Sequence, residues 1–524
     1  MANRTDYSPW QGAIHTVRFA SGEVEAYSHI CEKRDSLPLV SMVREDGNFC
    51  WTLNGECLYD STGNKAVVLG GTARPRFDVT GRGLVLSCGG RVWTSSDTDT
   101  NKSGGQSVYF NSGREFMICC LNDSLQLFVP TENFRLLLPR GVPLQGFYKD
   151  VFMDAGVYLT TRNTLHAATY LGYSLESVSC SNVADTAWQN TVIGGSDEDL
   201  NGRLLYPDGA PRYRLLFVCG GKATMHGNSL REECRERMRE FVRNGGSYVG
   251  TCAGAFFATS QRDMYLHIWP GQAKQTGLSN AHTGMFVDED SPLLRYYDFG
   301  GDNYVANIRH NGGCFALDWP VGTELLARFD YPQLEMHGKP SAWAYKKDIA
   351  SGRVIMEGSH PEEVSSGERR DFTAAMLRYA VDGVGETTIK GLLRNGEVRM
   401  MDKTTNDGNP EHTMIGDMQY HHFAVYIPQG AHNIRLRVAS DIDCNLQLSL
   451  KKGNYAYVDG TEYQSAGGGA EQELLFDNLS GGLWYVAVRC LTTVTATNVT
   501  LGQEYGGRTD VLNGVPYTIT VTWK

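Results

Sequence analysis

Hydrophobic and polar positions change their period twice along the chain, and these changes divide the sequence into three regions. Up to about residue 140, short apolar or alternating runs are separated by clusters of Gly, Asn and Asp, which is typical of β-strands joined by turns. Residues 51–58 carry Asn54-Gly55 between two β-prone runs, the strongest short signal for a hairpin. Residues 1–140 are therefore predicted to form a β-rich domain with a packing or recognition role rather than a catalytic one.

The middle region, residues 141–385, carries continuous apolar runs and helical spacing instead. Residues 213–219 are almost unbroken in their apolar character, which is typical of a buried parallel strand. Residues 229–244 place apolar side chains at helical intervals between charges, which predicts an amphipathic helix against a sheet. A short strand over residues 247–250 and a further helix follow. This succession predicts an α/β layer built on a parallel sheet.

From about residue 386 the period returns to two. Ile434, Leu436 and Val438 fall on one face of a predicted strand, with arginines opposite. The same alternation recurs in three further segments, at Leu446, Leu448 and Leu450, at Trp484, Val486 and Val488, and at Tyr517, Ile519 and Val521. Such strands with Gly-rich turns predict an antiparallel β-sandwich over residues 386–524.

Composition excludes several classes of protein. Hydrophobic residues at 41% and aromatic residues at 10% are values of a folded globular chain. The 48 basic and 59 acidic residues give a net charge of −11, which argues against a nucleic-acid partner. No stretch approaches the roughly 18 apolar residues of a membrane span. The 13 cysteines contain no Cys-x-x-Cys pair, so structural zinc is not expected.

The sharpest chemical feature is the segment Gly250-Thr251-Cys252-Ala253-Gly254, between a predicted strand and a predicted helix. A nucleophile on so tight a turn projects from the carboxyl end of a sheet, where α/β proteins bind ligands. Its flanking glycines are needed because the turn leaves no room for Cβ atoms. The following helix would favour the thiolate form of Cys252. The N–H of Ala253 would point at an oxyanion formed by attack at Cys252.

A nucleophilic cysteine needs a base and a group that orients the base. His360-Pro361-Glu362 follows a strand predicted over residues 353–359. Proline keeps the preceding His360 out of the helical region, and positions two apart in an extended chain share a side. Glu362 can therefore hold one nitrogen of His360 while the other faces Cys252. The neighbouring Glu363 is the alternative orienting group, but in an extended chain its side chain would point to the side opposite His360. A closing helix is expected over residues 369–379.

A second oxyanion donor should come from another junction of strand and loop. Gly220-Gly221 ends the strand that begins near residue 213, and glycines let the backbone approach a ligand closely. Gly221 is the predicted donor. Cys219, Cys234 and Cys314 are expected to be inert core thiols.

The paired glycines, the cysteine turn and the His-Pro-Glu segment together resemble a class I glutamine amidotransferase-like domain. Residues 241–255, His310-Asn311-Gly312-Gly313 and residues 352–354 resemble the branch called the biotin-protein ligase N-terminal domain family. The likeness covers about residues 145–385. It implies a flavodoxin-like α/β sandwich with a triad of Cys252, His360 and Glu362. Biotin ligation is not implied, because no adenylate-forming ligase region accompanies the likeness, and no synthetase domain is present to accept ammonia.

Residues 481–488 and 517–521 are similar to bacterial pre-peptidase C-terminal domains. This likeness implies an exported enzyme, present as a mature chain in the periplasm or at the cell surface of a bacterium. The first residues contain no apolar core of a signal peptide, so a cytoplasmic location stays open.

The sequence thus predicts a multidomain protein, with a central flavodoxin-like α/β sandwich between an N-terminal β-rich domain and a C-terminal antiparallel β-sandwich. The predicted activity is that of a thiol hydrolase or amidase. Cys252 attacks an amide carbonyl, His360 shuttles the proton, Glu362 orients the imidazole, and water resolves the thioester. The N–H groups of Gly221 and Ala253 hold the oxyanion. No metal or cofactor is expected.

The expected substrate is a small amide or peptide, or a polymer that the β domains bring to the site. A peptidase differs only in substrate. The alternative from another class is a non-catalytic ligand-binding or surface-assembly protein that keeps the fold. Neither substrate identity nor oligomeric state follows from the sequence.

Other polar clusters have simpler interpretations. His412, His421 and His422 could suggest a metal, but are expected to be solvated near a strand edge. Asp288-Glu289-Asp290 is expected to be a solvent-exposed loop rather than a calcium site. Trp269-Pro270 and Tyr296-Tyr297 either line the cleft or pack in the core.

Overall fold

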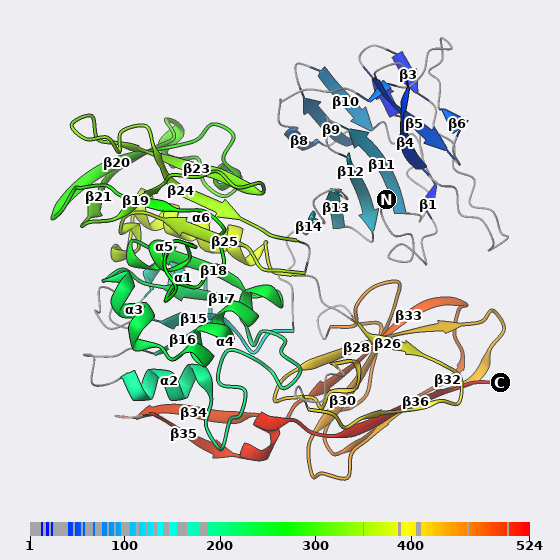
Figure 1. The fold of residues 1–524 in the computed structure, drawn as a ribbon. Helices are drawn as coiled ribbons and strands as arrows, with labels where there is room; N and C mark the ends of the chain where they lie inside the picture. The colour runs from blue at the N-terminus through cyan, green and yellow to red at the C-terminus, as the bar shows by residue number, and fades with distance from the viewer. Residues whose placement is uncertain are drawn as a thin grey trace. The chain divides into compact units, whose positions relative to one another are not determined.

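Figure 1 shows the computed structural model of the chain. The residues it describes are 146–154, 165–178, 186–348, 350–385, 389–404, 410–457, 461–499 and 502–524, together with the backbone of the strands that precede residue 140. The chain divides into two compact units, Met1–Pro143 and Leu144–Lys524.

The first unit is built from β-strands, as its turn-rich pattern predicts. They form two five-stranded sheets and one four-stranded sheet. Their bounds are β1 (Gly12–Ala13), β2 (Val17–Phe19), β3 (Gly22–Val24), β4 (Val40–Glu45), β5 (Asn48–Leu53), β6 (Glu56–Cys57), β7 (Val67–Val68), β8 (Arg76–Thr80), β9 (Gly83–Cys88), β10 (Arg91–Ser95), β11 (Gly105–Asn111), β12 (Glu115–Leu121), β13 (Ser124–Val129) and β14 (Phe134–Pro139). Strands β5 and β6 pair antiparallel with Leu53 opposite Glu56, which confirms the predicted hairpin.

The second unit contains a nine-stranded mixed sheet in the order β16-β15-β17-β18-β25-β24-β23-β20-β21. Its first five strands run parallel, and the remaining four pair antiparallel. The bounds are β15 (Lys149–Asp154), β16 (Leu175–Val178), β17 (Tyr213–Val218), β18 (Ser247–Thr251), β20 (Ala281–Val287), β21 (Tyr304–His310), β23 (Thr323–Asp330), β24 (Pro340–Tyr345) and β25 (Val354–Glu357). A two-stranded sheet of β19 (Ala273–Gln275) and β22 (Cys314–Ala316) accompanies it.

Helices pack against both faces of this sheet, as an α/β layer requires. One apolar cluster joins the strands to α1 and α6, and a second joins them to α2 and α4. The helices are α1 (His166–Tyr170), α2 (Thr186–Gly194), α3 (Ala223–Ser229), α4 (Glu232–Arg243), α5 (Ala253–Phe257) and α6 (Glu368–Val381), with short 3₁₀ turns at Pro292–Arg295, Phe299–Gly301 and Pro361–Glu363.

The helix expected over residues 229–244 is shorter than predicted and follows another helix. Helix α4 begins at Glu232, and α3 ends at Ser229, because Leu230 between them is extended. Helix α3, which the sequence did not reveal, is seven residues long and carries no apolar stripe of its own. The closing helix predicted over residues 369–379 is confirmed as α6.

The last part of the chain forms two sheets around one apolar cluster. The five-stranded sheet has the order β26-β28-β33-β30-β31, and the four-stranded sheet the order β27-β36-β29-β32. The strands are β26 (Ile389–Leu393), β27 (Val398–Met401), β28 (Tyr420–Ile427), β29 (His432–Ala439), β30 (Leu446–Lys452), β31 (Tyr463–Gln464), β32 (Glu471–Asn478), β33 (Gly482–Cys490), β34 (Val494–Val499), β35 (Gly502–Gly507) and β36 (Tyr517–Thr522), with 3₁₀ turns at Pro410–His412 and Thr509–Asn513. Strands β34 and β35 pair separately.

The alternation of period two correctly predicts which side chains enter this core. All twelve apolar residues on which the prediction rested are buried in it. One pairing differs from the antiparallel prediction, because β26 runs parallel to β28. The next strand along the chain, β27, belongs to the other sheet, so no hairpin fixes the direction of β26 within its own sheet.

The prediction that His421 and His422 are solvated is wrong. Both side chains are buried, because β28 pairs on both sides and is not an edge strand. His421 Nδ1 lies 2.8 Å from the hydroxyl of Tyr517, and its Nε2 lies 3.6 Å from Asp208. His422 stacks on the ring of Tyr420.

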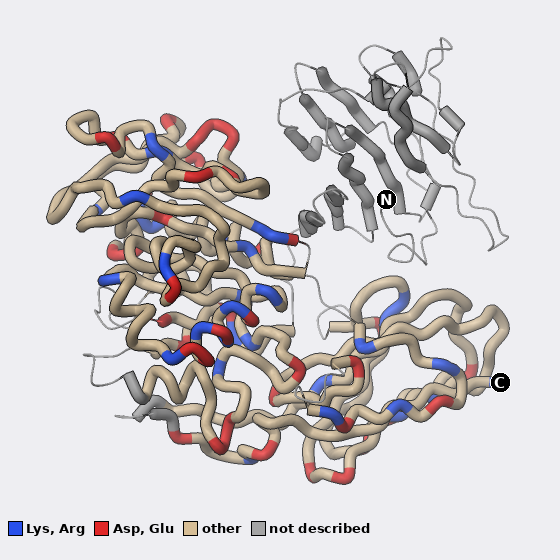
Figure 2. The backbone as a smooth tube through the Cα atoms, viewed as in Figure 1, with Lys and Arg blue, Asp and Glu red and all other residues tan. Residues whose placement is uncertain are grey.

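Buried ion pairs join the two-sheet region to the α/β layer. Arg212 Nη1 lies 2.7 Å from Asp417 Oδ1, with both side chains fully buried, and Lys390 Nζ lies 2.8 Å from Asp208 Oδ2. Acidic and basic residues are interspersed along α4, which can be followed in Figure 2. No helix among the described residues is long and apolar enough to cross a membrane.

Candidate active site

Cys252 occupies a sharp turn between β18 and α5. Its backbone has φ 50° and ψ −103°, a conformation that residues with a side chain rarely adopt. The N–H of Cys252 donates to the carbonyl of Glu357 at 2.8 Å. On the other side of the turn, the hydroxyl of Tyr248 donates to the carbonyl of Gly254 at 2.7 Å. Two buried hydrogen bonds therefore hold the strained turn in place.

The two glycines of the turn are required by close backbone contacts. A Cβ atom at Gly254 would lie 2.2 Å from the carbonyl oxygen of Val218, in the neighbouring strand. A Cβ atom at Gly250 would lie 2.5 Å from the carbonyl oxygen of Gly254. The expectation that positions 250 and 254 must be glycine, because Cβ atoms do not fit there, is confirmed.

His360 and Glu362 meet at the end of β25, beside the turn. His360 Nδ1 lies 3.1 Å from Glu362 Oε1, and the hydroxyl of Thr251 donates to the same oxygen at 2.9 Å. The backbone N–H of His360 donates to the carbonyl of Arg309 at 3.0 Å. Since Thr251 precedes Cys252, the carboxylate of Glu362 is linked both to the imidazole and to the strand that carries the thiol.

The backbone that brings these groups together is not extended, so that part of the prediction is wrong. Residues Pro361–Glu363 form a 3₁₀ turn, which begins with proline at its first position. The ring of proline fixes φ near a value suited to the start of a helical turn, so the chain bends directly after His360. The bend still turns Glu362 back to the imidazole.

Glu363, the alternative orienter, points elsewhere. Its carboxylate forms a two-pronged ion pair with Arg309, with Nη1 at 2.9 Å from Oε1 and 3.0 Å from Oε2. The two adjacent glutamates therefore have separate partners, and Glu362 is the one in contact with His360.

The pKa of His360 is set by burial and by its two neighbours, Glu362 and Cys252. Burial lowers the pKa of this imidazole, but the negative charge of Glu362 and hydrogen bonds to Cys252 and Glu362 outweigh it and raise the pKa well above its usual value. The side chain of Cys252 is 3% exposed, and its thiol lies 3.8 Å from the carbonyl oxygen of Asn311. An imidazole whose pKa is raised therefore lies in hydrogen-bonding contact with a sheltered thiol.

Gly220, the first of the paired glycines, lies against the imidazole of His360. A Cβ atom at Gly220 would lie 2.1 Å from Cε1 of His360, so glycine is required there for contact with the ring. Gly221 has φ 144°, in the region open to glycine. The roles of Gly221 and Ala253 as oxyanion donors stay predictions.

Two buried residues next to the site were missed. His310 is fixed by two hydroxyl groups, with Nε2 at 2.6 Å from Thr276 Oγ1 and Nδ1 at 2.7 Å from Ser359 Oγ. Glu357 is completely buried, and its Oε2 accepts the N–H of Ser359 at 2.8 Å. A charged residue at the end of an otherwise apolar strand was the only signal for Glu357, and the His-Asn-Gly-Gly segment was the signal for His310.

Of the aromatic candidates, Trp269 is buried, whereas Tyr296 and Tyr297 are only partly buried, where they pack against the core. Trp269 is buried against Trp343, and its Nε1 donates to Thr323 at 3.0 Å. Tyr296 forms a hydrogen bond with Asp382. In the part of the chain that the structure describes, no group of three or more His, Cys, Asp or Glu side chains could hold a metal ion.

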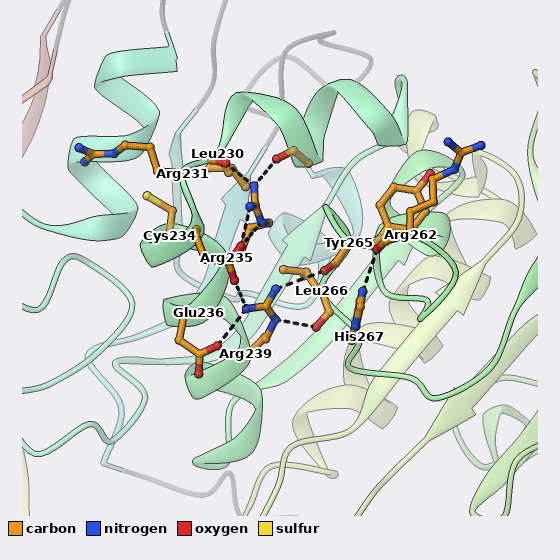
Figure 3. Close-up of polar contacts among 12 residues, drawn as sticks. Leu230, Arg231, Cys234, Arg235, Glu236, Arg239, Arg262, Tyr265, Leu266 and His267 are labelled. Atoms are coloured by element: carbon orange, nitrogen blue, oxygen red, sulfur yellow. Dashed lines mark hydrogen bonds and ion pairs between the residues drawn. The ribbon is translucent and has the colours of Figure 1, made fainter.

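Hydrogen bonds join helix α4 to the segment that follows α5. Figure 3 shows Arg239 reaching the carbonyl oxygens of Leu266 at 3.1 Å and Tyr265 at 3.4 Å, while Arg235 reaches that of Leu230. Within the segment, His267 Nε2 lies 2.7 Å from the carbonyl of Arg262. Arg239 therefore links α4 to the segment that follows α5, and Arg235 links α4 to the residues that precede it.

One comparison with known proteins covers the cysteine turn. The family model described as "Biotin-protein ligase, N terminal" matches residues 209–266, which run from β17 through the cysteine turn. An uncharacterized protein of Chlamydia muridarum is 27% identical over 207 residues, or 35% of this chain and 76% of that protein. A biotin–protein ligase of Schizosaccharomyces pombe is 22% identical over 228 residues, or 38% of this chain. The match spans 34% of that ligase.

Two solved structures are similar at low TM-score. A Thermoplasma acidophilum protein described as a putative GMP synthase subunit has a TM-score of 0.30 at 12% identity, over 45% of this chain and 96% of its own. The pre-peptidase C-terminal domain of a collagenase from Bacillus anthracis has a TM-score of 0.16 at 12% identity, over 26% of this chain and 100% of its own. The similarity to the N-terminal part of biotin-protein ligases is a sequence similarity over residues 209–266.

Proposed function

We propose that the protein is a cysteine-nucleophile hydrolase that cleaves an amide or peptide bond through a thioester on Cys252. The observation that carries the proposal is the contact of His360 Nδ1 with Glu362 Oε1, beside a cysteine on a strained turn. A carboxylate on Nδ1 leaves Nε2 of the imidazole for the thiol, which is the logic of a catalytic triad.

The reaction follows from these groups. Cys252 as thiolate attacks the amide carbonyl, and a tetrahedral oxyanion forms, for which we propose the N–H groups of Ala253 and Gly221 as donors. His360 gives its proton to the leaving amine, and the thioester remains on Cys252. His360 then takes a proton from water, the resulting hydroxide attacks the thioester, and the acid product and free thiol are released.

The finer assignments of fold and location belong to the same proposal. We propose that the mixed sheet and its helices form a flavodoxin-like α/β sandwich, and that the two C-terminal sheets form a β-sandwich. A bacterial chain exported to the periplasm or cell surface stays a prediction, as does its action on a surface polymer.

The second candidate is a ligand-binding or assembly protein without turnover. The 3% exposure of Cys252 favours it, because a substrate must reach the thiol. Against it stands the raised pKa of His360, which binding alone does not require.

A panel of glutamine and short-peptide anilides tests the proposal. We expect release of the aniline by the wild type, an acyl adduct on the peptide containing Cys252 after an acid quench, and loss of both in Cys252→Ala. Turnover that persists in Cys252→Ala would refute the proposed nucleophile. A wild type that forms no adduct with any member of the panel would favour the binding protein.

A further inference from the structure

Glu357 is a buried glutamate next to the candidate triad. It is the last residue of β25, where it is the register partner of Thr251 in β18. Register partners in neighbouring parallel strands direct their side chains to the same face of the sheet. Since the hydroxyl of Thr251 reaches Glu362, the side chain of Glu357 lies on the face where Glu362 is found.

The carboxyl oxygens of the two glutamates differ in how they are paired. Glu362 Oε1 is in contact with both His360 and Thr251, whereas its Oε2 has no hydrogen-bond partner among the described residues. Glu357 Oε2 accepts the N–H of Ser359, whereas its Oε1 likewise has no partner within the described part of the chain. Each buried carboxyl group thus has one oxygen without a partner.

Two ionised carboxylates cannot both be stable here. Burial, followed by the negative charge of Glu362, raises the pKa of Glu357 well above its usual value. Besides Glu362, the charges that act on Glu357 are those of His360, which lowers its pKa, and of Cys252, which raises it, and Glu357 in turn raises the pKa of Cys314. Where two carboxyl groups share a buried site, one of them keeps its proton.

We propose that Glu357 is a positioning residue of the triad, a neutral carboxylic acid whose Oε1–H donates to Oε2 of Glu362. The hydrogen bond satisfies both unpartnered oxygens and leaves the negative charge on Glu362, opposite His360. The protonation of Glu357 is independent of the proposed activity, but its consequence for catalysis rests on that activity.

The consequence concerns the basicity of His360. A hydrogen bond to Oε2 disperses the charge of Glu362 and fixes the rotamer in which Oε1 meets Nδ1 of the imidazole. It therefore keeps the pKa of His360 lower than a free carboxylate would. Neutral carboxylic acids that donate hydrogen bonds in apolar sites have this kind of role in other enzymes. The backbone of Glu357 also holds the cysteine turn, since its carbonyl accepts the N–H of Cys252.

Infrared difference spectroscopy tests the protonation directly. We expect the wild type near about pH 7, where an ordinary Glu is ionised, to show the carbonyl stretch of a protonated carboxylic acid. The signal should disappear in Glu357→Gln, whose amide can replace both hydrogen bonds, and remain in Glu335→Gln, an exposed control. Asp199, whose pKa is also raised by burial, is the same in both proteins, so any signal from it cancels in the difference.

A second measurement follows the imidazole of His360 by NMR. Glu357→Leu removes the donor, so we expect a higher pKa of His360 than in Glu357→Gln, which should resemble the wild type. An unchanged infrared band in Glu357→Gln would overturn the proposal, and so would equal pKa values in the two variants. If the band behaves as expected but Cys252 proves inert, the proposed function fails and the assignment of Glu357 stands.

Discussion

The imidazole of His360 and the carboxylate of Glu362 are 3.1 Å apart, and the second is only two residues beyond the first. Such a short-range contact would be unremarkable on a surface, but both side chains are buried next to Cys252. The adjacent Glu363 provides an internal comparison, because it has the same charge and pairs with Arg309 instead.

Glu362→Gln should lower the pKa of His360. Burial still disfavours the imidazolium in this variant, while the negative charge that stabilises it is gone. In the matched variant Glu363→Gln, the pKa of His360 should stay near that of the wild type. NMR titration of the imidazole gives both values. Equal shifts in the two variants would mean that Glu362 is not the orienting group.

Gly220→Ala should displace the imidazole without unfolding the protein. The new methyl group would lie 2.1 Å from Cε1 of His360, so the ring must move away from Cys252. Reaction of Cys252 with iodoacetamide below neutral pH should then fall at least about tenfold, the effect expected for loss of a positioned base. Gly338→Asn, at an open surface site, is the control. Unchanged labelling in Gly220→Ala would show that the ring position is unimportant.

The buried pair of Arg212 and Asp417 should stabilise the contact between the α/β layer and the two-sheet region. Arg212→Met leaves a buried carboxylate without its partner, and removing one member of such a pair costs about 3–5 kcal/mol. Arg212→Met combined with Asp417→Leu should recover much of the loss. Urea unfolding measures these free energies. Lys274→Met, in an exposed ion pair with Glu335, should leave the free energy of unfolding near that of the wild type.

Stability should fall as the pH drops below neutral, in part because of His422. Burial lowers the pKa of this imidazole to about 3, so the unfolded chain takes up a proton from about pH 6.5 downward while the folded protein does not. The free energy of unfolding should therefore decrease between these values, by about 2 kcal/mol at pH 5 for this one residue. His422→Phe keeps the aromatic packing and should flatten the dependence, as urea unfolding at two pH values would reveal.

The sequence was most informative where a pattern is repeated locally. Alternation at Leu446, Leu448 and Leu450 correctly predicts one buried face, because the period of a strand is a property of its own backbone. The glycines around Cys252 likewise indicate a tight turn that the structure contains.

Features that depend on distant segments were not predictable in this way. The burial of His422 depends on strands that pair with β28 on both sides, and the position of Glu357 depends on its register with Thr251. The importance of Gly220 appears only when His360, far along the chain, lies against it. Pairing and register across a sheet leave no local trace in composition or period.

The pH dependence of alkylation at Cys252, resolved by peptide mass, tests the central claim most directly. We expect fast labelling of wild-type Cys252 at pH values where an ordinary thiol hardly reacts, with the buried Cys314 of the same sample unlabelled. In His360→Ala this labelling should be lost and return only at alkaline pH. Labelling of the wild type that requires alkaline pH and is indifferent to His360→Ala would contradict an activated nucleophile at Cys252.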